Sequence, residues 1–273
     1  GLGRDEQQVL EDAAVWGASG TVEVLQRIAT AMRAGEDVTP VVRNLADQDV
    51  LVLDDEEWSF RSDLIREVAY GRLTKRERLI RHLGIAEFLD RKFREADADD
   101  GTVDTVTRHF VEAARLDRDL GRAHQERAVV AHAVRWALEA ARRAESDATW
   151  ELARRLYTQA LDLLDDESDP VAVESRFRCL VGRSRVRSEV WDEAGARRDA
   201  ADALELADSL GDPADRAVAL LRLGTAAARA GDSERAEVEL SESIRIFEET
   251  GDLQGQAEAL REIHHDGLVG RQA

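Results

Sequence analysis

Nucleotide turnover usually relies on a lysine that follows a glycine-rich turn, because the ammonium group of that lysine reaches the β- and γ-phosphates. This chain has only two lysines, Lys75 and Lys92. They follow Thr74 and Arg91, so neither belongs to a phosphate-binding loop. The sequence also has no GxGxxG motif and no alternating strand and helix pattern. We therefore predict no catalytic residue and no nucleotide turnover in this segment.

Residues for metal or nucleophile chemistry are also few. The six histidines form no HExxH motif and no pair at i and i+4; they are His82, His109, His124, His132, His264 and His265. The single Cys179 excludes an intrachain disulfide and a CxxC metal site, and we interpret it as a buried thiol. The segment "GASG" (17–20) lacks the GxSxG spacing and is interpreted as a loop. No metal site and no bound cofactor are predicted.

One cationic stretch contrasts with the rest of the chain, whose net charge is −19. Residues 60–94 carry ten Lys or Arg and five Asp or Glu, a local net charge of +5. These cations either pair with neighbouring acids, at less than about 1 kcal/mol each, or form a docking surface for another domain or an acidic partner. The predicted docking residues are Arg66, Arg72, Lys75, Arg76, Arg78 and Arg81.

The composition predicts helices almost throughout, because Ala, Leu, Glu and Arg dominate and lose little conformational freedom in a helix. All three prolines stand where helices can begin, in Thr39-Pro40, Asp169-Pro170 and Asp212-Pro213. Thr and Asp can cap the first N–H groups of a helix, and Pro suits its first position. The excess of Arg over Lys indicates a bacterium with a GC-rich genome.

Three helices followed by a hairpin are predicted at the N-terminus. Apolar residues recur at helical spacing twice within residues 1–34, and a third helix starts at Thr39. The segment "VLVLDDEEWSF" (50–60) has two β-favouring runs around the acidic turn Asp54–Glu57, which predicts a hairpin. This order is typical of a winged helix. Beyond Ser62 the chain is expected to be helical, with one apolar side formed by Leu64, Ile65, Val68, Ala69, Leu79, Ile80, Leu83, Ala86 and Leu89.

Nucleic acid and membranes are not predicted as partners. The third helix offers Arg43 against Asp47 and Asp49, and carboxylates in a DNA groove would meet phosphate. The acidic hairpin turn would also be repelled by DNA. No apolar run approaches the ~20 residues that a membrane span needs, and the N-terminus has no signal peptide, so we expect a cytoplasmic location.

The second half of the chain contains a repeat. The same spacing of 12, 4 and 3 residues occurs in three sets: Ala141, Ala153, Tyr157, Ala160; Gly182, Ala194, Arg198, Ala201; and Gly224, Ala236, Leu240, Ser243. The sets start 41 and 42 residues apart, which is longer than the about 34 residues of a tetratricopeptide repeat. Small residues at this spacing predict stacked helical hairpins. A fourth unit begins near residue 251, and we expect it to be incomplete.

These features define an expected organisation. A mainly helical chain would begin with a winged-helix-like domain with a small β-hairpin and its connecting helices (1–93). A linker (94–104) would lead to a right-handed, tetratricopeptide-like helical repeat array (105–273).

The chain resembles one region of multidomain signalling proteins, on the segments "VLEDAAVWG" (9–17), "FRSDLIREVAYGRLTKRERLIRHLGIAEFLD" (60–90) and "TRHFVEAA" (107–114) and on the repeats. In those proteins a STAND-type ATPase module precedes a winged helix and tetratricopeptide-like repeats. The wording of residues 60–78 is most similar to bacterial class III adenylate/guanylate cyclases. Large LuxR-type transcription regulators share the arrangement. Much of the family has a His where this chain has Ser62, so a role of that His does not transfer.

The resemblance implies a regulatory segment that carries partner or ligand binding to a cyclase through an ATPase switch. ATP would bind to the part of the parent protein outside this segment, and the catalytic activity would be that of the parent cyclase. The implied partners are the upstream ATPase and cyclase domains, together with a protein or peptide in the repeat groove. The alternatives are the same segment in a LuxR-type regulator or a stand-alone repeat scaffold.

Overall fold

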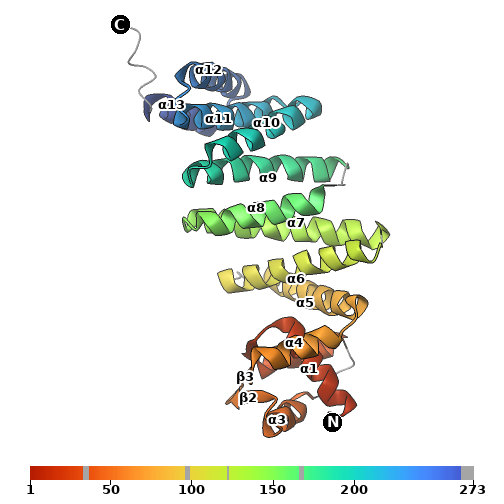
Figure 1. Cartoon of the computed structure of the whole chain (residues 1–273). Helices are drawn as coiled ribbons and strands as arrows, with labels where there is room; N and C mark the ends of the chain where they lie inside the picture. Colours follow the sequence, from red (N-terminus) through yellow and green to blue (C-terminus); the bar gives the residue numbers. More distant parts are fainter. Residues whose placement is uncertain (33–36, 96–98, 122, 166–168, 266–273) are drawn as a thin grey trace. The chain divides into compact units, whose positions relative to one another are not determined.

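The computed structural model describes residues 1–32, 37–95, 99–121, 123–165 and 169–265 (Figure 1). The described residues are mainly helical, with one small antiparallel sheet, as the composition predicts. The chain forms two compact units, residues 1–136 and 137–273, and helix α7 (Ala123–Ser146) contributes to both.

Unit 1 begins with three helices and a three-stranded sheet. The helices are α1 (Arg4–Trp16), α2 (Val22–Met32) and α3 (Thr39–Asp47), and the strands are β1 (Ser19–Thr21), β2 (Leu51–Asp54) and β3 (Glu57–Phe60). The strands lie in the order β1-β3-β2, and all pairs are antiparallel. The predicted hairpin is thus confirmed as β2 and β3. The core between the helices and the sheet includes Leu25, Leu45 and Trp58, each at most 1% exposed.

Strand β1 corrects the prediction that "GASG" is only a loop. Ser19 pairs with Ser59 and Gly20 with Trp58. The indole Nε1 of Trp58 donates a hydrogen bond to the carbonyl of Thr21 at 3.1 Å. A Cβ on Gly20 would lie 2.7 Å from Nε1 of Trp16. The close approach of β1 to the Trp16 ring therefore requires glycine at this position.

Three further helices continue unit 1: α4 (Asp63–Arg72), α5 (Lys75–Glu95) and α6 (Asp100–Asp119). The hydroxyl of Ser62 accepts a hydrogen bond from the Ile65 N–H at 3.4 Å, which confirms it as the cap of α4. Thr74 and Glu77 form a capping box at the start of α5, because Glu77 accepts from the Thr74 N–H and Thr74 Oγ1 accepts from the Glu77 N–H. Of the predicted linker 94–104, residues 96–98 lie outside the described residues, and α5 and α6 occupy most of the rest.

The single apolar side predicted beyond Ser62 is only partly correct. On α5, Leu79, Ala86 and Leu89 are buried, as expected. On the other hand, Leu64 and Val68 of α4 are 68% and 55% exposed, and Ile80 is 52% exposed. Of the residues predicted for this side of α4, only Ala69 is buried and Ile65 is half-buried, and α4 packs against α1. The periodicity identified the helices, whereas the neighbouring elements decided which sides they bury.

Unit 2 is a succession of antiparallel helices, each in contact with the next (Figure 1). After α7 they are α8 (Trp150–Leu164), α9 (Pro170–Glu189), α10 (Glu193–Leu210), α11 (Pro213–Arg229), α12 (Ser233–Thr250) and α13 (Leu253–His265). The turns after α7, α9 and α11 each contain one residue with a left-handed backbone: Ala148, Trp191 and Gly231, respectively. The turns after α10 and α12 contain one as well, Gly211 and Gly251, and the packing of each helix from α8 to α13 on the next confirms a helical repeat array.

Two of the three predicted helix starts at proline have the expected cap. Asp169 accepts hydrogen bonds from the N–H groups of Val171 and Ala172, and Asp212 accepts one from the N–H of Ala214. Thr39 is not the cap of α3, because it is already the first helical residue. Its N–H instead donates to the carboxylate of Asp37 at 2.9 Å.

The repeat register is confirmed in the first and third sets, whose eight residues are all buried. It is wrong in the middle set, where Ala194, Arg198 and Ala201 are exposed. The buried residues with the spacing of 12, 4 and 3 are Ser184, Ala196, Ala200 and Ala203, two positions further along the chain. Ser184 Oγ donates a hydrogen bond to the Ala196 carbonyl at 2.8 Å, which joins α9 to α10 at this crossing.

Candidate functional site

The predicted docking residues lie on α4 and α5, and three of the six have internal partners. Arg81 is 12% exposed and pairs with Glu11 at 2.8 Å and Asp12 at 3.0 Å, both on α1. Lys75 Nζ lies 2.6 Å from a carboxylate oxygen of Asp119 on α6. The guanidinium of Arg78 stacks on the Tyr70 ring, 4.3 Å from its centroid. These three cations therefore hold α5 against α1, α6 and α4.

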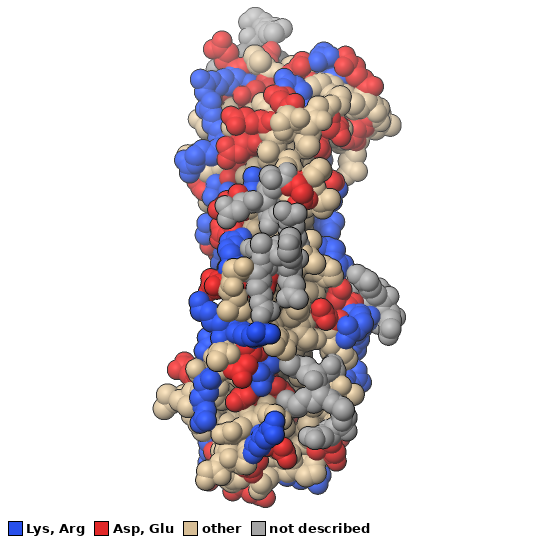
Figure 2. Space-filling model, turned by 90° about the vertical axis from the view of Figure 1, so that its right-hand side faces the viewer, with Lys and Arg blue, Asp and Glu red and all other residues tan. Residues whose placement is uncertain are grey.

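The other three differ in exposure. Arg66 is half-buried, and its charge acts on Tyr70 and Arg108. Arg72 and Arg76 are exposed, and neither has an ion pair or side-chain hydrogen bond with another described residue. Figure 2 shows acidic and basic side chains interspersed over one face of the molecule. The charge of Arg72 acts on Glu11 of α1, but a partner could pair with Arg72 and Arg76 without breaking an ion pair between described residues.

A chain of polar side chains joins four helices of unit 1; its two histidines are buried, Tyr70 is half-buried and Arg108 is exposed. His109 Nδ1 lies 2.9 Å from His82 Nδ1, and His82 Nε2 lies 3.2 Å from the hydroxyl of Tyr70. On the other side, Arg108 Nη2 lies 3.3 Å from His109 Nε2 and donates to the Trp16 carbonyl at 2.7 Å. The Trp16 ring also stacks on the His109 ring. We call Tyr70, His82, His109 and Arg108 the imidazole chain.

The Arg108 guanidinium determines which atom donates in each hydrogen bond of the imidazole chain. A guanidinium can only donate, so Arg108 donates to His109 Nε2 and the proton of a neutral His109 is on Nδ1. His109 then donates to His82 Nδ1, and His82 donates from Nε2 to Tyr70. Burial, reinforced by the positive charges of Arg108 and Arg78, lowers the pKa of His82 to about 3. Burial and the Arg108 charge likewise lower the pKa of His109 well below its usual value. Both rings are therefore neutral at pH 7.

Ion pairs with at least one buried partner cross between the helices of unit 2. Asp199 is 2% exposed, accepts two hydrogen bonds from Arg183 at 2.8 and 2.9 Å and forms an ion pair with Arg187 at 3.0 Å. Arg222 of α11 pairs with Glu258 of α13 at 2.5 Å. Glu145 of α7 pairs with Arg185 of α9. Each pair joins two helices that are close in space, and each charge is balanced by its partner. We therefore interpret these ion pairs as structural.

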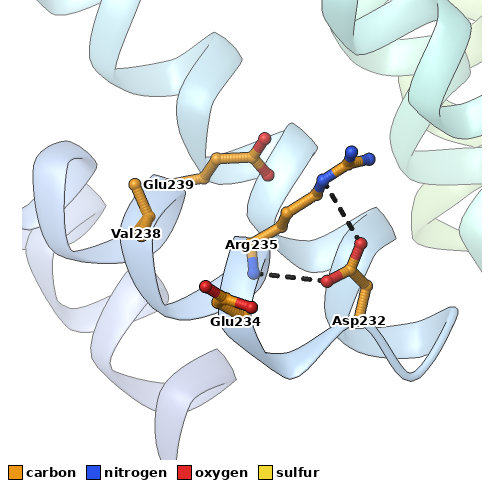
Figure 3. A pocket seen from close by; sticks show the side chains of 5 residues that line it. All are labelled: Asp232, Glu234, Arg235, Val238 and Glu239. Atoms are coloured by element: carbon orange, nitrogen blue, oxygen red, sulfur yellow. Dashed lines mark hydrogen bonds and ion pairs between the residues drawn. The ribbon is translucent and has the colours of Figure 1, made fainter.

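A hollow in unit 2 lies along the start of α12, lined by Asp232, Glu234, Arg235, Val238 and Glu239 (Figure 3). Asp232 pairs with the Arg235 side chain at 3.4 Å and also accepts from its backbone N–H. Burial raises the pKa of Glu239. The lining residues include three carboxylates and one guanidinium, and no Ser, Cys, Thr or His.

Groups with metal or thiol chemistry can be placed within the described residues. No cluster of three or more His, Cys, Asp or Glu with metal-binding geometry occurs among them. Cys179 is fully buried, which confirms the interpretation as a buried thiol, and burial raises the pKa of its thiol to about 12. None of the described helices is both long and apolar enough to cross a bilayer.

Sequence reasoning missed the imidazole chain. His82 and His109 are 27 positions apart and share no motif, so only the packing of α5 on α6 brings them together. It also missed the buried Asp90 of α5, which accepts hydrogen bonds from Arg135 at 2.6 Å and from the Trp136 indole at 3.1 Å.

Comparison with known proteins finds likeness only among solved structures. No protein-family model and no curated protein match the chain. One similar structure is a Signal Transduction ATPase with Numerous Domains (STAND) protein with a tetratricopeptide repeat sensor from Pyrococcus horikoshii, with 12% identity and a TM-score of 0.42. The likeness covers 97% of this chain but 47% of that protein, so this chain spans about half its length. Another is BtubC (BKLC) from P. vanneervenii, with 17% identity, a TM-score of 0.42 and coverage of 92% of this chain and 93% of that chain. At these TM-scores neither neighbour assigns a family or function.

Proposed function

We propose that this chain is a regulatory, protein-interacting segment of a multidomain bacterial nucleotide cyclase controlled by a STAND-type ATPase switch. In this proposal the first part of unit 1 is a winged-helix domain and unit 2 is a tetratricopeptide-like repeat array. The cyclase link comes from the resemblance of residues 60–78 to the class III adenylate/guanylate cyclase group.

The observation that carries the proposal is the order of elements. Helix α1, strand β1, helices α2 and α3 and the hairpin β2-β3 follow one another, with a sheet of order β1-β3-β2. A three-helix body with a small antiparallel sheet in this order supports a winged helix. Helical hairpins follow it in the same chain, which supports the sensor and switch arrangement of the signalling proteins that the sequence resembles.

DNA binding is not proposed for the winged helix. Asn44 of α3 and Gln48, which caps its C-terminal end, donate hydrogen bonds to the Glu6 carboxylate of α1. An acidic residue thus lies beside the outer polar side chains of the helix that would enter a major groove. The hairpin turn presents the exposed residues Asp55 and Glu56. These charges support packing against protein.

Regulation would work by packing. A partner held by the repeats would favour one arrangement of the modules over another, and its effect would equal the difference between its affinities for the two arrangements. ATP would be held by the upstream module, and no residue of this segment is assigned to it. The cationic residues of α4 and α5 would meet that module or another acidic partner.

The test is a cyclase assay on the full-length protein encoded by the gene. We expect it to convert ATP or GTP to a cyclic nucleotide, and we expect the rate to change when Arg72 and Arg76 are replaced by Glu. A gene with a helix-turn-helix domain downstream and no cyclase domain would favour the transcription-regulator alternative. A gene that encodes only this segment would favour the scaffold.

A further inference from the structure

Two aliphatic residues on one side of α4 are exposed. Leu64 and Val68 are one turn apart and are 68% and 55% exposed. Arg72 follows one turn later on the same side and is also exposed. We call Leu64, Val68 and Arg72 the α4 face. The side of α4 that carries Ala69 packs within unit 1, so the α4 face remains available for another molecule.

The charged residues near the α4 face are distributed unevenly along the helix. Arg72 at its end and Arg76 at the start of α5 have no ion pair with another described residue, whereas Arg81 and Lys75 are paired within unit 1. Asp63 and Glu67 are exposed near the beginning of α4. The cations are thus concentrated at the C-terminal end of the α4 face. In a protein of net charge −19, two exposed cations next to aliphatic side chains favour a partner with the complementary pattern.

We propose that the α4 face, together with Arg76, binds an amphipathic helix of a partner protein that carries aliphatic residues along one stripe and Asp or Glu at one end of it. The aliphatic stripe would cover Leu64 and Val68, and the carboxylates would pair with Arg72 and Arg76. Side chains one turn apart form a ridge against which a second helix can pack. An anionic membrane fits less well, because Asp63 and Glu67 flank the aliphatic residues and would be repelled by the lipid headgroups. The proposal rests on the protein-interaction role proposed above but not on the cyclase link.

The experiment uses the whole chain and a labelled synthetic helical peptide with a leucine stripe and glutamates at one end. Fluorescence anisotropy would measure the dissociation constant for the original chain and for the double variants L64S/V68S and R72E/R76E. Replacing the aliphatic pair should weaken binding by about tenfold or more, and reversing the arginine charges by about tenfold at low salt, less at high salt.

Matched controls lie on unit 2. Leu253 is 76% exposed and Arg198 is exposed, so Leu253→Ser and Arg198→Glu make the same chemical changes away from the α4 face. Both should bind the peptide with an unchanged dissociation constant. Circular dichroism and thermal unfolding would establish that each variant is folded, which we expect because all the changed side chains are exposed.

Several results would overturn the proposal: no saturable binding of the acidic peptide, equal binding of its lysine counterpart, or equal loss of affinity in the control variants. Binding to vesicles of phosphatidylcholine and phosphatidylserine that is lost in L64S/V68S would identify a membrane surface instead. A failure of the cyclase assay with intact peptide binding would contradict only the proposed parent protein. A working cyclase without peptide binding would contradict only the α4 face.

Discussion

Unit 1 buries titratable rings between its helices, whereas unit 2 brings its helices together through alanine, serine and glycine. In unit 1 the contact between α5 and α6 includes the neutral imidazoles of His82 and His109, whose Nδ1 atoms lie 2.9 Å apart. In unit 2 the corresponding crossings use Ala153, Ala196 and Ala236, all fully buried. The pH dependence of stability should therefore come mainly from the buried imidazoles of unit 1, whereas the helix crossings of unit 2, which also carry ion pairs, should be more sensitive to side-chain volume.

Acidification gives the largest expected difference between the units. The pKa of His82 is about 3 in the folded protein and about 6.5 in an unfolded chain. Between these values the unfolded chain binds the proton and the folded chain does not. The free energy of unfolding is therefore highest above about pH 6.5. Below that pH it falls by about 1.4 kcal/mol per pH unit for each buried histidine.

Hydrogen exchange at pH 7.5 and 5, corrected for intrinsic rates, would measure this effect. We expect protection to fall in α5 and α6 and to change little in α9 and α11. Similar losses in both units would show that the imidazole chain does not control the acid response. The double variant H82Q/H109Q should reduce the dependence of stability on pH between 5 and 7.5.

Overfilling a crossing in unit 2 should have the next largest effect. A Cβ on Gly182 would lie 2.3 Å from Cζ of Tyr157, whose hydroxyl is held by Glu145 at 2.5 Å. Gly182→Val should lower the free energy of unfolding by about 3 kcal/mol, since the ring has to move. Urea unfolding would measure the loss. Gly71→Val on α4 is the matched control, because nothing lies within 4 Å of its added Cβ; an equal loss there would point to backbone effects instead.

The smallest effect is expected at an exposed ion pair of unit 1. Lys75 and Asp119 are each about half exposed, so Lys75→Met should change the free energy of unfolding by less than about 1 kcal/mol. Peptide binding to the α4 face should also persist, because Lys75 already has a partner. A clear loss of affinity in this variant would extend the docking surface to Lys75, as the sequence predicts.

Much of the architecture follows from local patterns. The acidic turn between β-favouring runs predicted the hairpin, and Asp-Pro pairs predicted the starts of α9 and α11, because these features act within a few residues. The middle repeat shows where such patterns fail. Gly182 and Ser184 are both small, as are Ala194 and Ala196, so two registers fit the same spacing. Packing selects the one that leaves Arg198 in solvent and buries Ala200.

The sequence by itself determined a helical chain with one hairpin, a repeat of helical pairs and a concentration of cations on α4 and α5. These properties depend on neighbours in the chain. Only the tertiary structure decided that Lys75, Arg78 and Arg81 are held internally and that Leu64 and Val68 are exposed beside Arg72. The tertiary structure also decided that His82 and His109 lie in contact. Burial and pairing are set by residues far away in sequence, which helical periodicity cannot specify.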